Sequence, residues 1–257
     1  MMAALADLLG LAQTLLWQGF VTFLRIGPAV ALLPAFGEQS VPMRVRLVLA
    51  LAFTMICAPV APPAPIVPEN GAVFLLLAET AVGLTLGIGI RMFVMALQTA
   101  GSMAAQATSL AQIFGGAASE PMPAIGHVLV IAALALAVMS GLHVRAVELL
   151  IWSYDMFPMG RFPAAAALSD WGIHQVSHAF SLAFSLAAPF VIVSVLYNLT
   201  LGVINRAMPQ LMVAFVGAPV ITAGGLFLLF LLAPLIVTRW HDALVLFLAN
   251  PFAGAGP

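Results

Sequence analysis

Long apolar runs separated by short polar stretches dominate the chain. A helix needs about 20 consecutive apolar residues to cross a bilayer. Six runs are the candidates: Leu8–Phe36, Val45–Pro59, Ala72–Leu97, Ile125–Trp152, Gly172–Asn205 and Leu211–Val237. The second is short for a full span, and the last two contain no Asp, Glu, Lys or Arg. The pattern predicts an all-α, polytopic membrane protein whose helices form hairpins.

Prolines recur inside these runs, each after a small residue, at Pro28, Pro189, Pro219 and Pro234. Because proline frees a backbone carbonyl that lipid cannot satisfy, we expect kinked, Pro-broken helices that pack against protein or line a wet cavity. Residues 187–192 and 217–221 look alike around their prolines. Such matched interruptions can mark a transport site, and coincidence explains them equally well in a sequence with so few polar residues.

Composition supports the membrane class and argues against enzymes. Hydrophobic residues make up 63% of the 257 positions and charged residues 7%, against roughly 25% charged in soluble domains. All eight cations are arginines, so a lysine Schiff base or Ser-Lys dyad is excluded. His174 and His178 share a helix face but have no third ligand nearby in sequence. We expect no catalytic residue, no cofactor and no metal, and the net charge of −1 gives no reason to expect nucleic acid.

Uncharged polar residues form a stripe in the middle of the chain. They follow spacings of four, four, three and three, which places them on one helix face: Gln98, Ser102, Gln106, Ser109 and Gln112. The opposite face, with Val94, Ala96 and Ala104, is apolar. The stripe either forms hydrogen bonds with other helices or lines a channel.

The segment after this polar stripe favours the channel. Bulky apolar residues precede two glycines, which lets an apolar loop move at low backbone cost. We predict that a pore and its plug are built from Gln106, Leu110, Ile113, Phe114, Gly115, Gly116 and Met122. The alternative is a loop that only connects two helices and faces solvent.

Five ionisable residues lie inside apolar runs, where charges are costly: Arg25, Glu79, Arg91, Arg145 and Glu148. Arg145 and Glu148 are three residues apart and can pair on one helix face. Glu79 and Arg91 are roughly 18 Å apart along one helix, so each needs a partner elsewhere. Structural ion pairs are the favoured use over an ion relay. Arg206 and Gln210 follow the fifth run and are candidates for a subunit interface.

Four segments together resemble a known family. They are Leu33–Leu47, Thr99–Gln106, Leu142-His143 and Leu201–Leu211, the last followed by Phe215, Gly217 and Pro219. The last segment, with its Asn205-Arg206 and Pro209-Gln210 pairs, is the most specific. Ser102 and Ala105 depart from the family pattern, which has glutamate and glycine there. The chain is identified by these segments as similar to the FliR family of flagellar type III export-gate proteins.

The resemblance implies a fold and a function. Residues 1–170 would form a FliP-like helical part with a plug loop near 110–122, fused to a FliQ-like helical hairpin at 171–257. The chain would be a non-enzymatic core subunit of the export gate for unfolded flagellar proteins, in the bacterial inner membrane at the flagellar basal body. Its partners would be FliP, FliQ, FlhB and FlhA-like subunits, exported flagellar proteins and membrane lipid. The alternative is a small-molecule permease or channel subunit of the inner membrane, which would bind a solute near the midplane.

Overall fold

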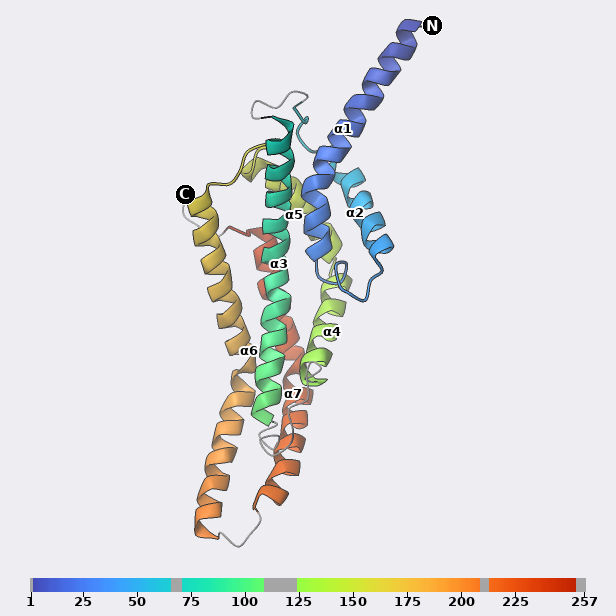
Figure 1. The fold of residues 1–257 in the computed structure, drawn as a ribbon. Coiled ribbons are helices and arrows are strands. Elements are labelled where there is room, and N and C mark those ends of the chain that lie inside the picture. The colour runs from blue at the N-terminus through green and yellow to red at the C-terminus, as the bar shows by residue number, and fades with distance from the viewer. Residues whose placement is uncertain (1, 66–70, 109–123, 209–212, 253–257) are drawn as a thin grey trace. The chain divides into compact units, whose positions relative to one another are not determined.

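The computed structural model describes residues 2–65, 71–108, 124–208 and 213–252. Within these ranges the chain is helical and has no strand (Figure 1). The helices are α1 (Met2–Leu32), α2 (Met43–Cys57), α3 (Ala72–Thr108), α4 (Ala124–Met139), α5 (Leu142–Met156), α6 (Ala165–Ala207) and α7 (Val213–Ala249). The predicted all-α class is confirmed.

The sequence predicted six candidate membrane spans, and the structure has fewer helices that could cross a membrane. Four helices are long and apolar enough to cross a membrane, over Leu5–Leu32, Ala72–Ala107, Ala165–Ala207 and Val220–Ala249. The second run forms only the 15-residue α2, which is too short to cross the hydrocarbon layer.

The fourth run is not one straight helix. It is divided into α4 and α5, which are bent by 70° relative to each other, so the pair counts as a fifth span only if the broken helix crosses as a unit. The break lies at Gly141, whose φ of 86° is a left-handed conformation that glycine adopts without strain.

The prediction that prolines break the helices is wrong at two positions. The helical conformation continues through Pro28 in α1 and Pro189 in α6. A proline removes one backbone hydrogen bond, and neighbouring helices can compensate for that loss. The break at Gly141 requires instead a reversal of φ, which ends the helical repeat.

The chain folds as two compact units. The first contains Met1–Arg91, Val138–Gln175 and Val245–Pro257, and the second contains Met92–Ala137 and Val176–Leu244. In the first unit, α1 and α2 lie side by side (Figure 1). Gln18 of α1 holds the proline-rich loop after α2, because its amide donates to the Pro62 carbonyl (2.9 Å) and accepts from the Ala64 N–H (2.6 Å).

The second unit is held by close backbone approaches and by polar anchors. A Cβ atom added to Gly101 of α3 would lie 2.3 Å from the Cα of Gly126 in α4, so the two helices meet where neither has a side chain. The fully buried Trp240 of α7 donates its indole N–H to the Phe93 carbonyl of α3 (2.7 Å). The Ser194 hydroxyl of α6 donates to the Ala107 carbonyl (2.5 Å). These bonds fix α3, α4, α6 and α7 in one packed group.

Candidate functional site

A buried ion pair forms the centre of the first unit. The Arg25 side chain on α1 and the Glu79 side chain on α3 are both 0% exposed. Their contact is bidentate, with Nε donating to Oε2 (2.7 Å) and Nη2 donating to Oε1 (3.1 Å). Bidentate arginine–carboxylate contacts combine charge attraction with a fixed direction. The pair therefore sets the position of α1 along α3.

The remaining donors of Arg25 are also satisfied. Nη1 donates to the Ser153 carbonyl (3.1 Å) and hydroxyl (3.2 Å), and Nη2 donates to the Phe157 carbonyl (2.9 Å). The Gly160 N–H donates to Glu79 Oε1 (2.9 Å), and the Arg25 guanidinium lies 3.9 Å from the centre of the Tyr154 ring. All five N–H groups of the guanidinium have an acceptor. This group, called the Arg25 cluster below, joins α1, α3, α5 and the segment after α5.

A second ion pair joins α3 to the segment between α1 and α2. Arg91 Nη1 donates to Glu38 Oε1 (2.5 Å), and Nη2 lies 3.4 Å from Glu38 Oε2. Both side chains are partly buried. The prediction that Glu79 and Arg91 find separate partners away from each other is confirmed.

The ion pair that the spacing of Arg145 and Glu148 allows in α5 is not formed. Arg145 and Glu148 are both exposed, and in the described ranges no ion pair joins them. Arg206 is exposed in the last turn of α6. Gln210 lies outside the described residues.

Three members of the polar stripe fall within α3. Gln98 and Ser102 are half-buried and Gln106 is exposed, whereas Ala96 and Ala104 on the opposite face are buried. Val94 is buried as well, but it lies one helical turn before Gln98 and so not on the opposite face. Within the described residues no side-chain hydrogen bond involves Gln98, Ser102 or Gln106. The described stripe thus lies on the side of α3 away from the core. Its last two members, Ser109 and Gln112, lie outside the described residues.

The predicted plug also lies outside them, apart from Gln106. Its other residues are Leu110, Ile113, Phe114, Gly115, Gly116 and Met122. The plug therefore stays a prediction.

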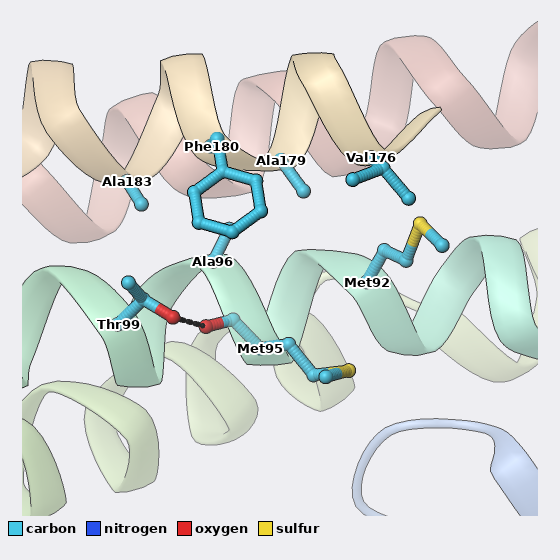
Figure 2. Close-up of a pocket in the computed structure, with 8 residues that line it drawn as sticks. All are labelled: Met92, Met95, Ala96, Thr99, Val176, Ala179, Phe180 and Ala183. Carbon is cyan, nitrogen blue, oxygen red and sulfur yellow. Dashed lines mark hydrogen bonds between the residues drawn. The ribbon is translucent and has the colours of Figure 1, made fainter. Parts of the chain in front are cut away.

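A small apolar cavity of about 120 Å³ lies between α3 and α6 in the second unit, and no sequence pattern indicated it. Figure 2 shows Phe180 extending from α6 toward Ala96 on α3, with Met92 on α3 and Val176 on α6 farther along. The one polar side chain in view, Thr99, donates its hydroxyl to the Met95 carbonyl (2.8 Å). These side chains provide neither a nucleophile nor a base, so the cavity is a packing site for apolar groups.

Metal and thiol chemistry are not supported by the described part of the chain. It contains no group of three or more His, Cys, Asp or Glu side chains that could hold a metal ion. His178 packs beside the Phe93 ring, with 5.9 Å between ring centres. Cys57, at the end of α2 and outside the four candidate spans, is buried, and burial raises the pKa of its thiol to about 11. Such a thiol is unreactive at neutral pH.

Comparison with known proteins gives the decisive observation. Residues 16–246 match the model of the family described as bacterial export proteins, family 1. The flagellar biosynthetic protein FliR of Caulobacter vibrioides is 32% identical over 230 residues, covering 86% of this chain and 90% of that protein. The chain belongs to this export family. FliR proteins of Escherichia coli and Bacillus subtilis are 31% and 28% identical, covering 87% and 77% of the chain and 88% and 79% of their own lengths.

Membership in the FliR family fixes the class of function. The chain is a component of flagellar protein export and not an enzyme. Its four candidate spans agree with a location in the cell membrane. The sequence identified this family from its motifs, and that identification is confirmed.

Sequence reasoning missed the partners of the buried charges. Glu38 was noted as part of a motif but not as the counter-ion of Arg91, and Ser153 and Gly160 were not noted as ligands of the Arg25–Glu79 pair. Arg25 and Glu79 are 54 positions apart. The one feature of the sequence that could have indicated this pairing is that Arg25 and Glu79 carry opposite charges and lie within separate apolar runs.

Proposed function

We propose that the chain is a core subunit of the flagellar type III export gate and forms part of the conduit for unfolded flagellar proteins. The observation that carries this proposal is the polar stripe on α3. Gln98, Ser102 and Gln106 lie on the side of α3 opposite its buried face, in the part of the helix after Arg91, which carries no charge. In a family of export proteins, an uncharged polar surface suits an unfolded chain because it offers hydrogen bonds without binding any one sequence tightly.

The loop that follows the polar stripe is the proposed plug. A conduit wide enough for an unfolded chain must be closed to ions when it is empty, and apolar side chains close pores by excluding water. Leu110, Ile113 and Phe114 would form the seal, with Gly115 and Gly116 as the hinge. Gln106 at the end of the described stripe would mark the boundary between conduit and seal.

The proposed partners are FliP, FliQ, FlhB and FlhA-like subunits. Residues 1–170 would correspond to a FliP-like part and residues 171–257 to a FliQ-like hairpin. The long helices α6 and α7, which carry large exposed apolar side chains, support a hairpin that packs against other subunits or lipid. Exposed Arg206 and its neighbour Gln210 would meet an adjacent subunit near the hairpin turn.

Deletion of the gene tests the role as a whole. The deletion strain should lack flagella and stop secreting flagellar proteins into the medium, while its growth stays normal. A plasmid copy of the wild-type gene should restore both. Isolation of the tagged chain should also recover FliP- and FliQ-type proteins, whereas a permease would be isolated without them. A deletion strain that still swims would refute the proposed function.

A further inference from the structure

Two helices of the second unit carry segments whose length matches a bilayer. Residues 186–203 of α6 and residues 220–237 of α7 contain no Asp, Glu, Lys or Arg. At about 1.5 Å per residue each segment is about 27 Å long, close to the roughly 30 Å of hydrocarbon in a membrane. Polar side chains inside the α6 segment are hydrogen bonded, as Ser194 is to Ala107 and Tyr197 is to Gly217. These segments are suited to contact with lipid tails.

On α7 the charge-free segment ends at Thr238 and Arg239, which are both exposed. On α6 residues without charge continue beyond the segment as far as Trp171, and Ser185 is a polar residue within that run. Ser185 and Arg239 line one groove between the two helices, so the groove lies where the charge-free surface of α7 ends.

The groove has the form of a site for an amphiphile. Its volume is about 460 Å³, and leucine, isoleucine and proline side chains make most of its wall, with Pro189 on α6 and Leu235 on α7 among them. The Ser185 hydroxyl donates to the Ser181 carbonyl (2.8 Å), so it is already engaged. Arg239 is the charged group of the wall. The groove thus combines an apolar wall with one cation at its edge.

Arg239 has no anion of its own in the ranges that the structure describes. Its side chain is exposed, and no ion pair joins it to Asp242, whose carboxylate lies 4.0 Å from His241 Nδ1. An arginine beside hydrocarbon without a counter-ion is costly, and an anion that arrives with its own apolar chain would remove that cost. A guanidinium also binds phosphate oxygens in a bidentate manner.

We propose that the groove between α6 and α7 binds an anionic phospholipid, with an acyl chain along the apolar wall and the phosphate on Arg239. Basic pockets between membrane helices bind such headgroups. The assignment is independent of the proposed export role, since it depends on the groove and on the charge at its edge.

The test is native mass spectrometry of the full chain with phosphatidylglycerol and with phosphatidylcholine. The wild-type chain should retain phosphatidylglycerol about fivefold better, as expected for one arginine at an anionic headgroup. Arg239→Gln should bring that ratio near one, and Leu235→Trp, which fills the groove but keeps the charge, should reduce retention of both lipids. Arg161→Gln, at an exposed arginine of the first unit, is the control and should behave as wild type.

Two outcomes would overturn the assignment. The first is an unchanged lipid ratio in Arg239→Gln, and if that variant also loses co-isolated export subunits, Arg239 binds a carboxylate of a neighbouring protein instead. The second is displacement of phosphatidylglycerol by millimolar inorganic phosphate, which would show a site for the free anion only.

Discussion

The charges of Arg25 and Glu79 are tolerated in the interior because every polar atom of the two side chains has a partner. Removing two charges from water is expensive, and it is offset only when the geometry is good and the remaining donors are satisfied. The five bonds of Arg25 and the Gly160 N–H on Glu79 meet that condition. Removing one member leaves the other charge buried and unpaired.

Arg25→Ala should therefore destabilise the protein by about 3–5 kcal/mol. Arg25→Lys should recover only part of this loss, because an ammonium cannot reproduce the bidentate contact. Thermal unfolding of the purified chain in detergent measures the effect. Arg145→Ala, at an exposed arginine of α5, is the matched control. Equal unfolding temperatures for Arg25→Ala and Arg145→Ala would contradict the structural role of the Arg25 cluster.

Cys57 provides a probe of the same unit without mutation, since it is the one cysteine in the sequence. With a pKa of about 11, about 0.1% of the thiol is ionised at pH 8, against about a quarter at an ordinary pKa of 8.5. Maleimide should label the folded chain slowly, faster by about tenfold for each added pH unit up to the pKa. In the denatured chain Cys57 should be labelled as fast as an ordinary exposed thiol. Rapid labelling of the folded chain at pH 8 would show that Cys57 is not buried.

At the scale of helices, close approach of small residues determines how α3 meets α4. Gly101 faces Gly126 and has no room for a methyl group, since an added Cβ would lie 2.3 Å from the Gly126 Cα. Gly101→Ala should cost about 1–3 kcal/mol by forcing the helices apart. Gly224→Ala in α7, where an added Cβ meets no atom within 4 Å, should instead be neutral or stabilising by up to about 1 kcal/mol. Thermal unfolding of both variants measures the difference. Similar stabilities for the two variants would argue against a tight α3–α4 crossing.

The sequence predicted the helices better than their breaks. Apolar runs identified the long helices, because nearly continuous hydrophobicity is sufficient evidence for a membrane helix. The break at Gly141 was missed, since one glycine inside an apolar run does not show whether its φ is positive. At Pro28 and Pro189 the error was the opposite one, because a break was predicted there and the helix continues through the proline.

For the candidate site, helical spacing predicted which residues share a face of one helix, but it could not predict contacts between residues far apart in the sequence. Gln98, Ser102 and Gln106 follow one periodicity and lie on one face of α3, as predicted. The ligands of Arg25 could not be predicted, because Ser153 is 128 positions away and acts through its backbone carbonyl as well as its hydroxyl. Every residue has a backbone carbonyl, so the sequence does not show which of them accepts a hydrogen bond.

For the whole molecule, the proposed plug predicts a leak when it is removed. Deletion of residues 114–119 should leave a chain that still assembles with its partners but no longer closes the conduit. Cells that express it should take up small ions and grow slowly in high salt, as measured by growth curves and by an ion-sensitive dye. Arg145→Ala, at an exposed residue of α5 outside this segment, is the control. An assembled deletion variant with wild-type permeability would assign the segment to a plain connection.

The most direct test of the central claim is to ask whether an exported protein passes the polar stripe. A photo-crosslinking amino acid is placed at Gln98, Ser102 or Gln106 in cells whose export is stalled by a substrate fused to a tightly folded domain. The control position is Phe230, which is 81% exposed on the charge-free part of α7. The account predicts substrate adducts at the stripe positions and none at Phe230. Adducts absent from all three stripe positions, in cells where the stalled substrate is trapped in the gate, would contradict it.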